Sequence, residues 1–165
     1  MKRQLATLAV VSSALALAAC QKKAPEELPP PPADTSAMQD TGPVPGSQAD
    51  FLARMNGRQV IYFDTDRYNI DSVDAAALQT QAQWLLQYPA KRATVEGHCD
   101  ERGTRDYNLA LGERRANAAK NYLVGLGIDA SRISTVSYGK ERPVALGSDE
   151  SAWARNRRAV TVTID

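Results

Sequence analysis

The sequence contains only two cysteines, Cys20 and Cys99, and one histidine, His98, among its 165 residues. So few cysteines exclude a fold built on several disulfides, and a zinc site needs three or four ligands. The same shortage disfavours an enzyme that uses an activated nucleophile or a metal-bound water. We therefore expect no catalytic residues, no metal site and no cofactor.

An excess of charge of one sign is also missing. The chain has 20 Lys and Arg residues against 19 Asp and Glu residues, for a formal net charge of +1. Proteins that bind nucleic acid usually carry a basic surplus that neutralises phosphates. The balance therefore argues against a nucleic-acid partner.

A long apolar stretch occurs only at the N terminus. Lys2 and Arg3 precede an apolar run over residues 5–17, and small residues follow it. A cationic start, a short apolar core and a small-residue exit are typical of a secretory signal peptide, which we assign to residues 1–19. The run is too short to span a bilayer comfortably.

The small residues before Cys20 resemble the lipobox of bacterial lipoproteins. That resemblance implies cleavage after Ala19 and lipidation of Cys20. Gln21, rather than an aspartate, follows the cysteine, which by analogy favours the outer membrane, with the folded domain facing the periplasm. The alternative is an ordinary signal peptide that happens to contain a cysteine.

Proline is concentrated in one segment. Seven of the nine prolines lie between Pro25 and Pro45, among few large apolar residues. Such a composition cannot bury enough surface to fold, so we interpret residues 20–50 as a disordered linker, stiffened locally as polyproline II. A ligand for a proline-recognising module is the alternative. Residues 51–165 have the length of one domain with a single core.

Hydrophobic patterning in the domain predicts alternating strands and helices. Strands are expected at 60–63, 94–96, 133–138 and 159–164, and helices at about 71–87 and 107–126, with a helical turn or two at 151–156. The second helix carries a core stripe spaced by three and four residues: Leu109, Gly112, Ala116, Ala119, Leu123 and Leu126. Gly127 can close this helix. The order β-α-β-α-β-β predicts a two-layer α/β (α+β) sandwich, with helices on one face of a mixed sheet.

The densest polar stretch, residues 97–104, lies between the second strand and the second helix. The helix then presents Asn108, Leu111 and Arg115 on one face, near an N terminus that favours anions. Asp100 could accept an ammonium while Arg115 binds a carboxylate, which suits an amino-acid centre that is free at both ends. The spacing agrees equally well with a direct ion pair between Asp100 and Arg115.

Other polar side chains near this stretch have simpler interpretations. We expect His98 to be hydrogen-bonded at the end of its strand and Cys99 to be a small buried thiol. Glu101 and Arg102 would hold the loop by local pairing. Residues 156–158 are either a solvated charge run or a support for the loop.

Four long motifs are similar to one known family. Residues 58–165 resemble the OmpA-like peptidoglycan-binding domain, most closely that of the peptidoglycan-associated lipoproteins. The motifs are GHCDERGT (97–104), YNLALGERRAN (107–117), ISTVSYGKERP (133–143) and NRRAV (156–160).

The resemblance implies a non-catalytic outer-membrane lipoprotein that binds the diaminopimelate of peptidoglycan stem peptides and tethers the membrane to the cell wall. By motif position, Asp100 would meet the ammonium of this amino acid and Arg115 its carboxylate. Asp66, Asn108 and Leu111 would line the same pocket. A periplasmic Tol propeller protein is the implied partner, within the Tol–Pal system of envelope integrity and cell division. The alternatives are an OmpA-like wall anchor outside the Tol system and a wall hydrolase.

Two positions depart from the family pattern. Thr65 stands where the family often has phenylalanine, and Cys99 where it often has threonine. The first departure puts in doubt how apolar the pocket edge is. From the sequence we also expect Asp100→Ala or Arg115→Ala to abolish co-sedimentation with cell-wall sacculi while the domain stays folded.

Overall fold

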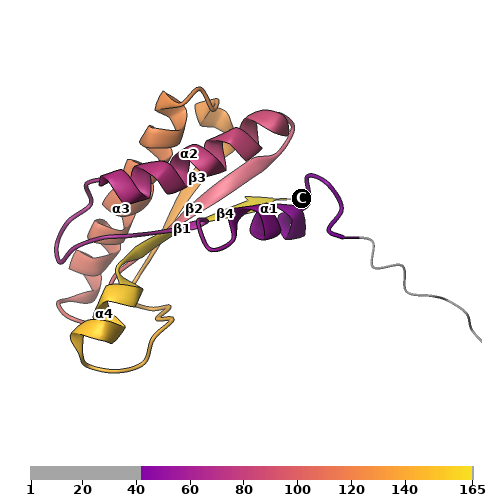
Figure 1. Cartoon of the computed structure of the whole chain (residues 1–165). Helices are drawn as coiled ribbons and strands as arrows, with labels where there is room; N and C mark the ends of the chain where they lie inside the picture. Colours follow the sequence, from indigo (N-terminus) through magenta and orange to yellow (C-terminus); the bar gives the residue numbers. More distant parts are fainter. Residues whose placement is uncertain (1–41, 165) are drawn as a thin grey trace, which may run out of the picture. The chain divides into compact units, whose positions relative to one another are not determined.

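A computed structural model describes residues 42–164. The expected signal peptide, the lipidated Cys20 and the linker up to residue 41 lie outside the described residues. The elements, labelled in Figure 1, are α1 (Gln48–Met55), β1 (Val60–Tyr62), α2 (Ser72–Gln87), β2 (Arg92–His98), α3 (Arg105–Gly125), η1 (Ala130–Arg132), β3 (Ile133–Gly139), α4 (Glu150–Asn156) and β4 (Arg158–Ile164). No helix between residues 42 and 164 is both long and apolar enough to cross a membrane.

The strands form one mixed sheet in the order β1-β4-β2-β3. β4 runs antiparallel to both β1 and β2, whereas β2 and β3 are parallel and are connected through α3. The helices α2 and α3 lie next to each other across one face of the sheet, as Figure 1 shows. The predicted two-layer architecture is confirmed, and the expected strands and helices are found within about two residues of their predicted ends.

A pair of glycines brings α3 against β2. A Cβ atom on Gly97 would lie under 3.0 Å from the carbonyl oxygen of Gly112, and one on Gly112 would clash with the hydroxyl of Ser137. That hydroxyl donates to the carbonyl of Leu109 at 2.7 Å. The helix backbone therefore rests directly on the strand backbone, which places the first turns of α3 beside the end of β2.

The helix α1 begins three residues before the expected domain boundary. The Ser47 hydroxyl caps it by accepting from the backbone N–H of Asp50 at 3.1 Å. Phe51 and Met55, one turn apart, are buried, and the Phe51 ring meets the Trp84 ring edge-on at 5.0 Å. The indole N–H of Trp84 donates to Asp50 at 2.9 Å, so apolar and polar contacts both fix α1 to α2.

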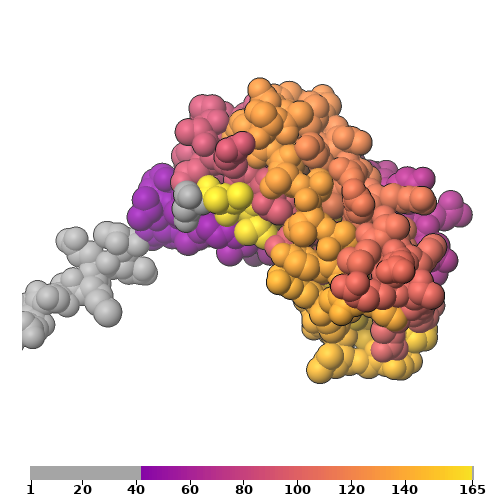
Figure 2. All heavy atoms as spheres, turned by 180° about the vertical axis from the view of Figure 1, so that it is seen from behind, coloured from indigo at the N-terminus to yellow at the C-terminus, as the bar shows by residue number. Residues whose placement is uncertain are grey.

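The N-terminal end of α1 also contacts β4. The backbone N–H of Thr163 donates to the side-chain oxygen of Gln48 at 2.8 Å. Figure 2 shows the yellow strand β4 beside the indigo helix α1. This contact attaches α1 to the C-terminal strand of the sheet.

Candidate ligand-binding pocket

A cavity of about 260 Å³ opens where the end of β2, the β1–α2 loop and the first turns of α3 meet. The five ligand residues predicted from the sequence all line it: Asp66, Asp100, Asn108, Leu111 and Arg115. Its lining also includes side chains that the sequence did not assign to the ligand, notably Arg102, Tyr107 and Arg157.

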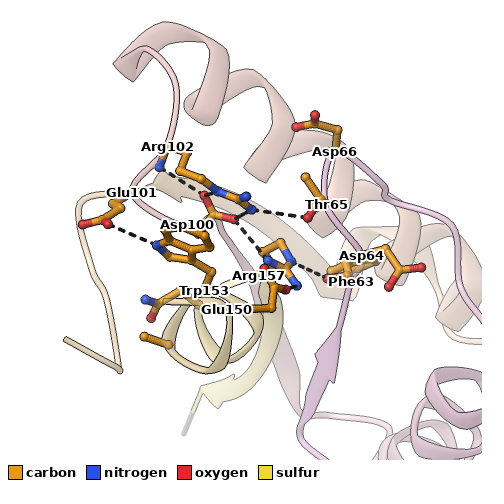
Figure 3. Close-up of polar contacts among 12 residues, drawn as sticks. Phe63, Asp64, Thr65, Asp66, Asp100, Glu101, Arg102, Glu150, Trp153 and Arg157 are labelled. Atoms are coloured by element: carbon orange, nitrogen blue, oxygen red, sulfur yellow. Dashed lines mark hydrogen bonds and ion pairs between the residues drawn. The ribbon is translucent and has the colours of Figure 1, made fainter. Parts of the chain in front are cut away.

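Two arginines hold Asp100: Arg102 from the β2–α3 loop and Arg157 from the junction of α4 and β4 (Figure 3). Its carboxylate accepts from Nε and Nη2 of Arg102 at 3.0 and 2.7 Å, and from Nη1 of Arg157 at 3.4 Å. Burial tends to raise the pKa of Asp100, but the hydrogen bonds from Arg102 and Arg157 outweigh it and lower the pKa below its usual value. No ion pair between Asp100 and Arg115 occurs in the described part of the chain, so the paired arrangement that the spacing allowed is not adopted.

Arg157, which follows α4, is the main pocket residue that the sequence interpretation missed. Its Nε donates to the carbonyl of Phe63 at 3.0 Å and its Nη2 to the carboxylate of Glu150 at 2.5 Å. It therefore joins Asp100 to the end of β1 and to α4. Of the two readings left open for residues 156–158, support for the loop is confirmed, since Arg157 is only 6% exposed. The sequence signal that could have identified Arg157 was its position immediately before an alternating strand.

Arg115 is fully buried and binds main-chain carbonyls. Its Nε donates to the carbonyl of Arg67 at 2.9 Å, its Nη1 to that of His98 at 2.8 Å and its Nη2 to that of Asp64 at 3.1 Å. Burial lowers the pKa of Arg115, but an arginine remains charged at neutral pH. Three of its five N–H groups thus hold the β1–α2 loop against β2, and the side chain also lines the cavity.

Asn108 shapes the loop between β2 and α3. Its side-chain amide donates to the carbonyls of Arg102 and Thr104 at 2.7 and 3.0 Å. Gly103 lies between them with φ of +84°, a conformation that glycine adopts readily. Leu111, one turn further along α3 and 6% exposed, adds an apolar wall to the cavity.

The β1–α2 loop forms the opposite edge of the cavity. Asp66 has a left-handed backbone, with φ of +57°, and accepts from the hydroxyl of Tyr107 at 3.2 Å. The hydroxyl of Thr65 accepts from Nη2 of Arg102 at 3.3 Å. A phenylalanine could not accept this bond, so the departure at Thr65 makes the pocket edge more polar at this point.

Both side chains that end β2 and begin the loop are buried. Cys99 donates through Sγ to the carbonyl of Asn108 at 3.3 Å, and burial raises its pKa to about 11. The prediction of a buried thiol is confirmed. The expected hydrogen bond of His98 is wrong: neither ring nitrogen has a partner, and the nearest oxygen of Glu96 is 3.6 Å from Nε2. The His98 ring instead packs near that of Tyr138, with the centroids 5.4 Å apart.

The buried imidazole of His98 should make the domain less stable in mild acid. Burial, and then the charges of Arg158 and Arg142, lower its pKa from 6.5 to about 4. Because the unfolded chain then binds the proton first, the free energy of unfolding should fall as the pH drops from 6.5 towards 4. The loss should be at most about 3 kcal/mol and should level off below the folded-state pKa.

This histidine is the only one in the sequence, so an NMR titration of its ring reports the folded-state pKa directly. Urea denaturation at a series of pH values should show a smaller acid-dependent loss of stability for His98→Phe than for the wild type. A ring that titrates near 6.5 in the folded protein would contradict the expected burial effect.

The charges of the pocket favour a ligand that carries a carboxylate and a cation together. Three guanidinium groups, of Arg102, Arg115 and Arg157, and two carboxylates, of Asp66 and Asp100, line the cavity. The positive N-terminal end of α3 adds to the attraction for an anion. Within residues 42–164, no group of three or more His, Cys, Asp or Glu side chains is placed to hold a metal ion.

A mixed four-stranded sheet with α2 and α3 on one face, and a charged pocket at the β2–α3 loop, define a domain of the OmpA-like class. The model of the OmpA family matches residues 62–157. The chain is 50% identical over 149 residues to the peptidoglycan-associated lipoprotein of Agrobacterium fabrum, which covers 90% of this chain and 82% of that relative. It is 56% identical over 118 residues to the one from Rhizobium meliloti, covering 72% and 66% of the two chains.

Among solved structures, the crystal structure of the peptidoglycan-associated lipoprotein from Burkholderia pseudomallei matches with a TM-score of 0.65 and 44% identity. The match covers 70% of this chain and 100% of that one. The chain therefore belongs to the peptidoglycan-associated lipoproteins of the OmpA family.

Proposed function

We propose that this protein binds peptidoglycan non-covalently through the diaminopimelate of its stem peptides. The names of its relatives support an association with peptidoglycan. The observation that carries the ligand assignment is that Asp100 and Arg115 line one cavity of about 260 Å³. That volume is below the usual ~300–1,000 Å³ of ligand pockets, so it suits a single amino-acid centre rather than a glycan strand.

The free D-centre of diaminopimelate carries an ammonium and a carboxylate on one carbon. In the proposed complex, the carboxylate accepts from the N–H groups of Arg115 that the main chain does not use, and the ammonium donates to Asp100. Leu111 packs against the methylene chain of the ligand, while Asn108 and Asp66 form the sides of the pocket. The role is non-catalytic, and the buried, protonated thiol of Cys99 supports this because it is a poor nucleophile.

The proposed tether has a membrane end as well as a wall end. Lipidation of Cys20 would hold the chain in the outer membrane, because each buried CH₂ of an acyl chain contributes about 0.8 kcal/mol. The domain would then face the periplasm and reach the wall. We further propose that the protein acts in the Tol–Pal system, with a periplasmic Tol propeller protein as partner; its family membership supports this role. Copurification with that protein would separate this role from a wall anchor outside the Tol system.

Asp100→Ala is expected to reduce co-sedimentation of the full chain with isolated sacculi at least tenfold, because the ammonium loses its acceptor. The variant should stay folded, since Arg157 keeps its contacts to Phe63 and Glu150. Glu113→Gln, on an exposed position of α3, is the matched control and should bind normally. Undiminished sedimentation of a folded Asp100→Ala variant would refute the pocket assignment.

Calorimetry tests the carboxylate end of the same ligand. Muropeptides that carry diaminopimelate, its amidated form or lysine differ in whether they offer a free carboxylate beside the ammonium. The first should bind most tightly, because only it uses both Asp100 and Arg115. Equal affinities for all three would argue against this recognition.

A further inference from the structure

The carboxylate proposed to receive the ligand's ammonium already has a cation on its solvent side. Arg102 binds both oxygens of Asp100, at 3.0 and 2.7 Å. The side chain of Arg102 is 39% exposed, whereas those of Asp100 and Arg157 are 9% and 7% exposed. Arg157 is thus the inner counter-ion of Asp100 and Arg102 the outer one, at the mouth of the cavity.

The shape of the loop does not depend on the guanidinium of Arg102. The backbone N–H of Arg102 donates to Asp100 at 3.1 Å, and its carbonyl accepts from Asn108 at 2.7 Å. The ammonium of Lys140 holds the next carbonyls, those of Glu101 and Gly103, at 3.0 and 2.6 Å. Main-chain contacts therefore fix the loop, and the guanidinium can leave Asp100 without unfolding it.

The other contacts of the Arg102 guanidinium are to uncharged groups, so they do not prevent it from leaving Asp100. It lies over the ring of Trp153, with Cζ 4.2 Å from the centroid, and donates to the hydroxyl of Thr65 at 3.3 Å. Neither partner carries a charge; Figure 3 shows Trp153 and Thr65 near Arg102, and Thr65 also lines the cavity. The Arg102 side chain of this partly buried pair is 39% exposed, so water reaches it and another cation can take its place beside Asp100.

We propose that Arg102 is a displaceable counter-ion that moderates the preference of the pocket for ligands with an ammonium beside their carboxylate over ligands with a carboxylate alone. This inference rests on the proposed function. In the free protein Arg102 neutralises Asp100. A zwitterionic ligand exchanges its ammonium for the guanidinium, whereas a ligand with a carboxylate alone leaves Arg102 in place. Arg102 thereby lowers the affinity for the zwitterion and raises the affinity for the anion, because it keeps the carboxylate of Asp100 from repelling the anion.

The test uses the full chain in detergent and two probes. One is a tripeptide stem that ends in meso-diaminopimelate, and the other is the same peptide acetylated on the free D-amine. By calorimetry, Arg102→Ala should bind the amine form at least threefold more tightly than the wild type and the acetylated form at least threefold more weakly. Arg102→Gln should shift both affinities in the same directions. Arg105→Ala, an exposed arginine at the start of α3, should change neither.

Different outcomes would contradict the exchange at Asp100 and the proposed function. If the wild type binds the amine peptide and Arg102→Ala changes both affinities by the same factor, Arg102 only supports the loop and the exchange is wrong. Weaker binding of the amine form by both variants would instead make Arg102 a direct ligand contact, and the exchange is again wrong. Failure of the wild type to bind either peptide would overturn the proposed function and this inference together.

Discussion

Arg115→Ala should lower the free energy of unfolding by about 3–5 kcal/mol. The substitution removes a fully buried guanidinium and leaves the carbonyls of Asp64, Arg67 and His98 without the donors that now satisfy them. It also empties the space beside the ring of Phe63, which lies 5.2 Å from Cζ of Arg115. Urea denaturation of the full chain in detergent measures the loss.

The adjacent Arg114→Ala is the matched control. Arg114 is exposed and lies 5.9 Å from the ring centroid of Tyr68, so its removal should change stability by less than about 0.5 kcal/mol. Equal stability of the two variants would contradict the proposed role of Arg115 in holding the β1–α2 loop. These contacts revise the expectation from the sequence that Arg115→Ala stays fully folded. A loss of wall binding by this variant would therefore reflect a loss of stability as well as a lost ligand contact.

Gly97→Ala should destabilise the domain by more than about 3 kcal/mol or prevent folding. The new methyl group would lie under 3.0 Å from the carbonyl oxygen of Gly112, and this atom belongs to a helix backbone that cannot rotate away. Overpacking of a core usually costs about 1–3 kcal/mol, and here relief requires α3 to move off the sheet. Because Asn108, Leu111 and Arg115 reach the pocket from α3, wall binding should be lost as well. Thermal denaturation and sacculus binding test the two effects.

Gly125→Ala provides a control of opposite sign in the same helix. Nothing lies within 4 Å of a Cβ atom at Gly125, near the C-terminal end of α3. Alanine there should stabilise the domain by up to about 1 kcal/mol, because it has a higher helix propensity than glycine. If the two substitutions had the same effect, close backbone packing at Gly97 would not be the cause.

Most of the fold could be predicted because its signals are local. The buried stripe of Ala116, Ala119 and Leu123 and the closing glycine at 127, with φ of +97°, follow from spacings within a few helix turns. Leu109, at the start of the predicted stripe, is only half-buried and lies outside the core. The helix α1 was not predicted because the proline-rich segment before it suggested a linker. The signals for α1 were a capping serine at 47 and the pair Phe51 and Met55, one turn apart.

The pocket could be predicted less fully because its contacts join distant segments. Helical spacing places Asn108, Leu111 and Arg115 on one face, as observed. Spacing cannot show that Arg157 reaches Asp100 or that Arg115 binds the carbonyls of another loop. These bonds arise from strand order, which sets β4 between β1 and β2.

The buried Arg115 and Arg157 both donate hydrogen bonds to main-chain carbonyls of the segment after β1. Arg157 reaches the carbonyl of Phe63, while Arg115 reaches those of Asp64 and Arg67. A peptide oxygen is the same whichever amino acid bears it. Substitutions at Thr65 and Asp66 can therefore change which ligands this edge of the pocket recognises. The loop would still be held by Arg115 and Arg157.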